Sequence, residues 1–389
     1  MPSRLVILGS GVTALAVARN AHRNRLSPVV FDTQTGTASK TSLAQVEIHP
    51  GATDVESVNV LRKLGSNRKN LLIATGDDWL RFLVRYRPEL NEAYREILHP
   101  SNDTLNICLS KSEFASWCKA NGISSPELYQ IDPNRSIEAQ RIEFPVLLRP
   151  AITRHTERSK LIPKAVEVRS APELRHWLDV FASENCIPAV CESLLNQDVT
   201  QYSIGAARSG DSIVSFVAKK VRPHPESCEG GSYVELSPNA EAEALARKCL
   251  HLLRYHGIAE VEVFHSRKTG RTAVVEINAR PWVQYALASA SGHDLLRFMT
   301  DLSNYDAALE VKRGKTWIDF GRDAYVCFAK DGGLVRRGKI SFWRYLASLS
   351  RVNVCAKFSA SDLRPFWSDL RVGAKKLLRQ RAIGQESRT

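Results

Sequence analysis

The sequence predicts a protein of mixed α/β and α+β class with more than one domain, on three observations. The chain has 389 residues, more than a single hydrophobic core usually serves. Residues 4–32 run as strand, glycine turn, helix and strand, the order of a βαβ unit with parallel strands. Residues 201–219 and 259–277 each hold two runs of alternating apolar and polar residues around a short link, which predicts antiparallel hairpins.

The composition is that of a globular protein with a basic bias. Hydrophobic residues make up 43% of the chain and charged residues 24%, and the net charge is +13. This excess favours anionic ligands, and we expect small-molecule substrates rather than nucleic acid. There is no apolar run of about 18 residues and no signal-peptide layout, so we expect a cytoplasmic protein without a transmembrane helix. Eight scattered cysteines without a CxxC motif predict buried thiols and no zinc site.

The first element is an apolar strand, Arg4–Leu8, followed by a turn with Gly9 and Gly11 and by a helical pattern. Such a turn lets the helix N-terminus receive an anion. Asp32 ends the next strand, where a dinucleotide site places its ribose-binding acid. An NAD(P)-dependent oxidoreductase is therefore one alternative reading. A further strand at 70–75 precedes a helix, for which we interpret Asp77 and Asp78 as capping residues. The alternative is that they line a crevice at the strand ends.

The hairpin at 259–277 places acidic residues opposite one another. Period 2 puts Glu260, Glu262 and Phe264 on one face of the first strand, and Val274, Glu276 and Asn278 on one face of the second. Glu262 and Glu276 then face each other and repel unless a cation lies between them. Carboxylate and amide oxygens suit Mg²⁺, which takes its other ligands from phosphates and water. The alternative is a solvated amphipathic hairpin.

Glu262 together with Glu276-Ile-Asn278-Ala-Arg280 resembles the metal-binding signature of the ATP-grasp ligases. The resemblance implies that Glu262, Glu276 and Asn278 hold two Mg²⁺ ions, for which Mn²⁺ can substitute, on the phosphates of ATP. It also implies that Arg280 stabilises the transferring phosphoryl group.

Two earlier segments extend the resemblance. Residues 110–129, a predicted helix capped by Ser110 and the turn after it, resemble a segment whose lysine, here Lys111, contacts the α-phosphate side of ATP. Phe144-Pro-Val-Leu-Leu-Arg149-Pro resembles the strand whose lysine contacts the α- and β-phosphates. Arg149 keeps that charge but replaces a point charge with a planar fork. The phosphate-covering loop that follows, 151–163, departs from the family because it has no glycine.

Two later segments add candidate site residues. Residues 187–194 resemble the hinge strand that reads adenine, which implies nucleotide contacts by Glu192, the backbone near Leu194, and Asp198. The run from Lys219 to Gly231 resembles a subgroup of uncharacterised ATP-grasp carboligases. Lys220 and Arg222 are the candidates for binding the substrate carboxylate and the transferred phosphate.

The resemblance covers about residues 1–310 and implies a domain order. It predicts a Rossmann-like pre-ATP-grasp domain at 1–107, a small ATP-grasp lobe at 108–185, a large lobe with the metal site at 186–311, and a C-terminal extension with a basic tail at 312–389. The leucines and basic residues of the tail predict an amphipathic helix, which raises the hypothesis of peripheral membrane or lipid contact. A homodimer is a further hypothesis.

The implied activity is ADP-forming ligation of a carboxylate to an amine through an acyl phosphate, with an amino acid, a peptide or another small anionic acid as substrate. A second alternative is a non-catalytic homologue that binds nucleotide without turnover, because Arg149 and the glycine-free loop depart from the family.

Overall fold

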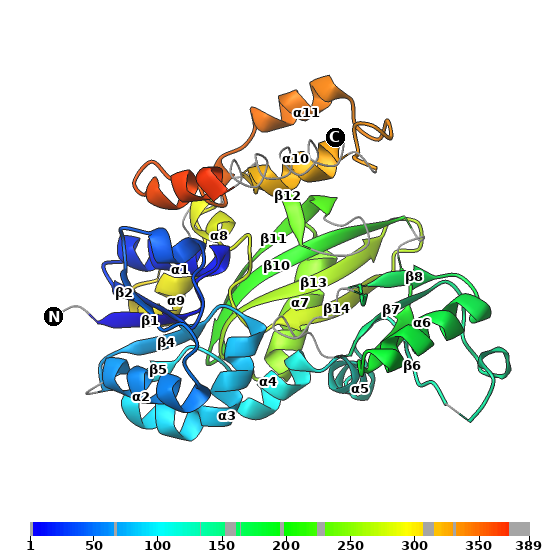
Figure 1. Cartoon of the computed structure of the whole chain (residues 1–389), viewed down its shortest axis with the longest axis horizontal. Coiled ribbons are helices and arrows are strands. Elements are labelled where there is room, and N and C mark those ends of the chain that lie inside the picture. Colours follow the sequence, from blue (N-terminus) through cyan, green and yellow to red (C-terminus); the bar gives the residue numbers. More distant parts are fainter. Residues whose placement is uncertain are drawn as a thin grey trace, which may run out of the picture.

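Three β-sheets organise the computed structural model (Figure 1). The residues that it describes are 3–65, 68–132, 134–151, 161–163, 165–194, 198–223, 230–305, 315–329 and 332–372. Within them, no helix combines the length and the apolar composition needed to cross a bilayer.

The first sheet is parallel, with the strand order β3-β2-β1-β4-β5. Its strands are β1 (Arg4–Leu8), β2 (Ser27–Asp32), β3 (Gln45–Ile48), β4 (Leu71–Ala74) and β5 (Glu96–Ile97). Its helices are α1 (Val12–Arg23), α2 (Asp54–Gly65) and α3 (Asp77–Ala93), with a short 3₁₀ helix at Thr37–Lys40. The central strand β1 is apolar from Leu5 onward and fully buried, as expected for a parallel strand covered on both faces. The predicted βαβ unit is confirmed.

The second sheet has seven strands in the order β14-β13-β10-β11-β12-β15-β16. They are β10 (Val199–Ser209), β11 (Ser212–Pro223), β12 (Gly231–Leu236), β13 (Gly257–Ser266), β14 (Thr272–Asn278), β15 (Thr316–Ile318) and β16 (Val354–Cys355). Associated helices are α4 (Asn102–Leu109), α7 (Ala240–Leu252), α8 (Ala286–Ala290) and α9 (Leu295–Thr300), with a 3₁₀ helix at Leu302–Asn304. Both predicted hairpins are present, as β10–β11 and β13–β14.

The third sheet is a smaller body beside β14 (Figure 1). Its order is β6-β9-β7-β8, from β6 (Leu128–Tyr129), β7 (Val146–Pro150), β8 (Val166–Val168) and β9 (Pro188–Glu192), with α6 (Ala171–Ser183) and a 3₁₀ helix at Ile137–Ala139. Leu174 and Phe181 of α6 are buried against Val146, Leu148 and Val190 of the sheet. The helix α5 (Lys111–Ala120) precedes this body, and Ser110 Oγ accepts a hydrogen bond from the Glu113 N–H at 3.3 Å, so the predicted cap at Ser110 is confirmed.

A C-terminal layer lies above the seven-stranded sheet, at the top of Figure 1. It comprises α10 (Phe320–Phe328), α11 (Phe342–Leu349) and residues 354–372. Arg222 of β11 fastens α10 to the sheet, because its Nε and Nη2 donate to the two carboxylate oxygens of Asp323 at 2.7 and 2.9 Å. Both side chains are almost fully buried, and Arg222 also lies 3.8 Å from the ring centroid of Tyr233.

His99 links the parallel sheet to the β13–β14 hairpin. The Ala74 N–H donates to its Nε2 at 2.7 Å, and its Nδ1 lies 3.0 Å from the Ala279 carbonyl oxygen. One ring nitrogen therefore accepts and the other donates, which requires the neutral imidazole. Burial lowers the pKa of His99 to about 3.

This histidine predicts a loss of stability in acid. The unfolded chain protonates His99 near pH 6.5 and the folded chain only near pH 3, so protons favour unfolding over that interval. Between pH 6.5 and 5 we expect a loss of about 2 kcal/mol in the free energy of unfolding from this residue. The measurement is urea unfolding against pH for the wild type and His99→Gln, whose amide keeps a donor and an acceptor without titrating. The variant should show the shallower pH dependence, and equal slopes would refute the assignment.

Candidate active site

The acids of the β13–β14 hairpin share one face of the sheet. Glu262 pairs with Glu276 and Glu260 with Asn278, so the predicted juxtaposition of the two glutamates is confirmed. The placement of Val274 beside Glu276 is wrong. A bulge shifts the register after Glu262, so Val274 pairs with Val263 and is buried in the core on the other face. One unpaired residue in a strand reverses the alternation beyond it.

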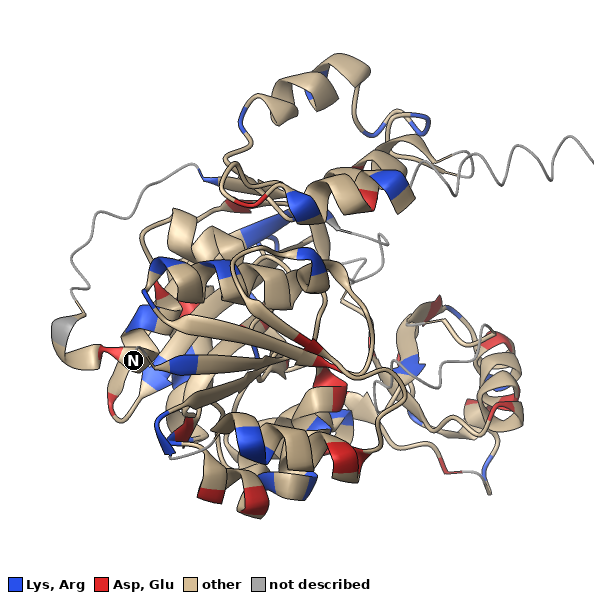
Figure 2. Ribbon diagram, turned by 60° about the vertical axis from the view of Figure 1, so that its left-hand side comes forward, with Lys and Arg blue, Asp and Glu red and all other residues tan. Residues whose placement is uncertain are grey.

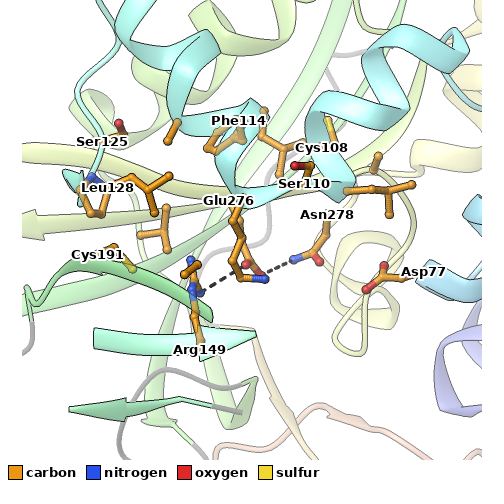
Figure 3. Close-up of a pocket in the computed structure, with 18 of the residues that line it drawn as sticks. Asp77, Cys108, Ser110, Phe114, Ser125, Leu128, Arg149, Cys191, Glu276 and Asn278 are labelled. Atoms are coloured by element: carbon orange, nitrogen blue, oxygen red, sulfur yellow. Dashed lines mark hydrogen bonds and ion pairs between the residues drawn. The ribbon is translucent and has the colours of Figure 1, made fainter. Parts of the chain in front are cut away.

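Two adjoining cavities lie over this face. The larger encloses about 820 Å³, including its open mouth, between the hairpin, α5 and the four-stranded sheet (Figure 3). Its polar lining includes Asp77, Lys111, Arg149, Glu276 and Asn278. The smaller, about 410 Å³, is lined by Leu147, Arg149, Cys191, Glu192, Leu194, Gln201, Glu262 and Phe264, among others. Because Arg149 and Cys191 line both, the cavities form one cleft.

Glu276 faces cationic side chains that lie on the opposite wall of the cleft. Arg149 Nη1 of β7 lies 3.6 Å from Glu276 Oε2, and Figure 3 shows the two side chains pointing toward each other. Burial alone would raise the pKa of Glu276, but the nearby charges of Arg149 and Lys111 lower it below its usual value. Burial and the Arg149 charge lower the pKa of Lys111. This end of the cleft therefore holds an ionised carboxylate between two cationic side chains.

Lys220 occupies the centre of the acidic face. Its Nζ lies 2.6 Å from Glu262 Oε1 and 3.9 Å from Glu260 Oε1, and Gln201 Nε2 donates to Glu262 Oε2 at 2.9 Å. Burial opposes the charge of Lys220, but the two glutamates raise its pKa above the usual value. Burial raises the pKa of Glu262 to about 7.

Asn278 and Arg280 connect the hairpin to the parallel sheet. Asn278 Nδ2 donates to Glu260 Oε2 at 3.0 Å, and Arg280 Nη2 donates to Asn278 Oδ1 at 3.4 Å. Arg280 Nε donates to Asp77 Oδ1 at 2.6 Å. The interpretation of Asp77 as a helix cap is wrong, because the N-cap of α3 is Gly76 and no side chain caps the helix. Asp77 instead lines the larger cavity.

The sequence matches no protein-family model and no curated protein. Solved structures share its fold. N5-carboxyaminoimidazole synthase from Aspergillus clavatus, in complex with ADP and 5-aminoimidazole ribonucleotide, has a TM-score of 0.63 at 15% identity, covering 80% of each chain. The biotin carboxylase domain of 2-oxoglutarate carboxylase from Hydrogenobacter thermophilus, in complex with MgADP and bicarbonate, has a TM-score of 0.61 at 12% identity, covering 81% of this chain and 73% of that one. L-amino acid ligase from Bacillus licheniformis has a TM-score of 0.57 at 13% identity, covering 81% and 78%.

These three neighbours are ATP-grasp enzymes. This chain has the ATP-grasp fold. The cleft described above lies between its four-stranded and seven-stranded sheets, and the site residues can be placed relative to it.

The residues predicted for the nucleoside end are only partly brought together. Glu192 and Leu194 line the smaller cavity. The Glu192 carboxylate pairs with both terminal nitrogens of Arg271, at 2.5 and 2.8 Å. Asp198 is exposed and lines neither cavity. The glycine-free stretch 152–160 lies outside the described residues.

Arg222 does not lie on the same face of β11 as Lys220. A bulge between them makes Lys220 pair with Val234 and Arg222 with Tyr233, so the two side chains leave opposite faces of β11. Lys220 reaches the glutamates, whereas Arg222 binds Asp323. The structure therefore corrects the expected proximity of Arg222 to the transferred phosphate.

The oxygen atoms on the acidic face suit a metal ion that also takes oxygen atoms from a bound ligand. Among the described residues, no three Asp, Glu, His or Cys side chains form a metal-holding cluster on their own. Glu262 and Glu276 are nevertheless directly paired, and Glu276 is joined to Asn278 by a weak hydrogen bond of 3.5 Å. Mg²⁺ commonly takes one or two carboxylates from the protein and its remaining oxygens from phosphates and water. The donor set therefore fits Mg²⁺ delivered with a nucleotide.

The glycine turn after β1 is occupied by the chain itself. The Ala38 N–H donates to the Ser10 carbonyl at 2.7 Å, and Ser10 Oγ donates to the Gln34 carbonyl at 2.8 Å. Asp32 accepts from the N–H groups of Thr33 and Gln34. Residues 34–38 thus cover the turn where a dinucleotide would place its pyrophosphate, which weighs against the oxidoreductase reading.

Proposed function

We propose that the chain is an ATP-dependent, ADP-forming carboxylate–amine ligase that works through an acyl phosphate. The observation that carries the proposal is the meeting of Lys111 and Arg149 with Glu276 and Asn278 in one cavity, joined to a second cavity that contains Glu262. Cations face acids across a cleft, which is the arrangement that binding a metal triphosphate requires.

Glu262, Glu276 and Asn278 would hold Mg²⁺, with two ions expected and Mn²⁺ as a substitute. When bound, the metal supplies charge neutralisation and alignment of the phosphates. Lys111 and Arg149 bind the phosphates from the opposite wall. Glu192 and the backbone at Leu194 contact the nucleoside in the smaller cavity, whose apolar lining includes Phe264 and Leu147.

Lys220 and Arg280 act on the reacting groups. Lys220 is the binding group for the substrate carboxylate, held in place by Glu262 and Glu260. Arg280, oriented by Asp77, stabilises negative charge on the transferring phosphoryl group. Enclosing this reaction in the cleft protects an acyl phosphate from water.

The substrates that the proposal implies are a small acid and an amine. An amino acid, a peptide or another anionic acid suits a cleft that is lined by Lys111 and Arg149 and adjoined by Lys220 and Arg280. The domain boundaries given above, a cytoplasmic location and a homodimer all stay predictions.

A substrate screen scored by phosphate release tests the function. Wild-type protein is incubated with MgATP and pairs of acids and amines. We expect release that requires both substrates and the metal, and a thermal shift with MgATP but none with NADH, because a ligand that binds only the folded state raises its stability. Stabilisation by MgATP without release in any pair would favour the non-catalytic homologue. Stabilisation by NADH alone would overturn the proposal.

A further inference from the structure

The C-terminal layer exposes a group of aromatic side chains far from the cleft. Trp343 is 76% exposed, Phe342 48%, Leu346 40% and Phe328 37%. The rings of Phe328 and Phe342 lie 6.3 Å apart, and those of Phe342 and Trp343 5.6 Å apart. We call Phe328, Phe342, Trp343 and Leu346 the aromatic patch. Leu346 follows Phe342 by four residues and so lies on the same side of α11. A contiguous exposed apolar surface is a candidate interaction site.

The patch is held rigidly from below. Tyr345, the buried residue of α11, packs edge-to-face on Phe328 with centroids 4.9 Å apart. Ser348 Oγ accepts a hydrogen bond from Arg222 Nη1 at 3.1 Å, and the Ser348 carbonyl accepts one from Tyr233 at 3.0 Å. These contacts connect α11 to α10 and to the seven-stranded sheet, and the apolar side chains of the patch lie on the outside.

The surface around the patch is basic. In the described part of the layer the acids Asp319, Asp323 and Asp362 are buried, and Asp369 pairs with Lys357 at 2.8 Å. Basic residues are instead exposed on and beside α11, namely Arg336, Arg337, Lys339, Arg344 and Arg351. Figure 2 shows Lys and Arg distributed over this layer.

We propose that the aromatic patch docks on the surface of an anionic lipid bilayer. Trp and Phe side chains are favourable at the level of the headgroups, and the surrounding Arg and Lys side chains are attracted by acidic lipids. A second copy of the chain is a poorer occupant, because it would bring two basic surfaces together. The proposal does not depend on the activity proposed above.

The test is co-sedimentation of the full-length chain with vesicles of phosphatidylcholine alone or mixed with phosphatidylglycerol. We expect binding only to the mixed vesicles, and weaker binding when salt is raised above about 0.1 M, where surface charges are screened over roughly 10 Å. Trp343→Ser and Arg344→Glu should each reduce the partition coefficient by about fivefold or more. Residues 373–389 remain in every variant, so any contribution of the tail is constant.

Val55→Ser and Lys63→Glu serve as matched controls, because both residues are exposed on α2, outside the C-terminal layer. They should sediment like the wild type. Loss of binding by the two patch variants, with the controls unchanged and circular dichroism preserved, supports the proposal. Equal sedimentation of all variants, or absence of binding to mixed vesicles, overturns it. Self-association of the wild type that Trp343→Ser abolishes, without vesicle binding, would also overturn it and assign the patch to a contact between copies.

Discussion

Glu276→Gln should abolish MgATP-dependent phosphate release while leaving the fold intact. The amide keeps the shape of the side chain but removes the charge that faces Arg149 at 3.6 Å and that lies opposite Glu262 in the hairpin. In its proposed role Glu276 would hold the metal ion, and a bound metal contributes several kcal/mol of charge stabilisation in the transition state. The rate of ADP release should therefore fall by about three orders of magnitude.

The measurement is a coupled ADP assay over a range of Mg²⁺ concentrations, with thermal unfolding as the check on folding. Glu138→Gln is the control, because Glu138 pairs with Arg175 on the surface of the small sheet at 2.6 Å and lines neither cavity. It should keep wild-type turnover. ADP release at the wild-type rate by Glu276→Gln would remove this residue from the chemistry and would remove the main support for the ligase proposal.

Asp323→Ala should destabilise the C-terminal layer strongly. Its carboxylate, fully buried, receives Arg222 through two hydrogen bonds and Ser232 Oγ through a third at 2.9 Å. Removing one partner of a buried ion pair leaves an uncompensated charge, which costs about 3–5 kcal/mol. Arg222 would then lie unpaired beneath α10, so we expect α10 and α11 to detach before the rest of the chain unfolds.

Hydrogen exchange of the amides of α10 and α11 measures this loss, together with the thermal midpoint. Asp369→Ala is the control, because its pair with Lys357 lies at the surface, where ion pairs contribute at most about 1 kcal/mol. The double variant Arg222→Met/Asp323→Leu should recover much of the lost stability, since it removes both charges. If the amides of α10 exchange as slowly in Asp323→Ala as in the wild type, the Arg222–Asp323 pair does not fasten the layer.

Periodicity in the sequence predicted the regular parts of the fold and the pairing of two acids in the candidate site. The pairing of Glu262 with Glu276 follows from alternation in two strands and a short link. The cap at Ser110 follows from local chemistry. These features depend on residues near one another in the chain, so a single sequence contains the information.

Three residues were predicted in the wrong place, two because of β-bulges and one because of a contact between residues that are distant in the chain. Val274 was placed by strict period 2 and Arg222 by the resemblance, and in each strand a single extra residue turns the side chain to the opposite face. The extra residues themselves, Val221 and Val275, are neither glycine nor proline. Asp77 and Arg280 are 203 residues apart, and only the position of Asp77 after a buried parallel strand signals a crevice. Glu260, which accepts from Asn278, was visible as a third acid on the same face but was not assigned to the site.

Around the cleft, cationic side chains interact with acidic ones before any ligand arrives. The cations are Lys111, Arg149, Lys220 and Arg280, and each interacts with at least one of the acids Asp77, Glu260, Glu262 and Glu276. Under the proposed function, free nucleotide would bring a large excess of negative charge into this buried setting, and a free divalent ion would bring positive charge. The complex of the two brings less net charge than the nucleotide alone, so each half raises the affinity for the other, and thermodynamic reciprocity makes that cooperativity equal in both directions.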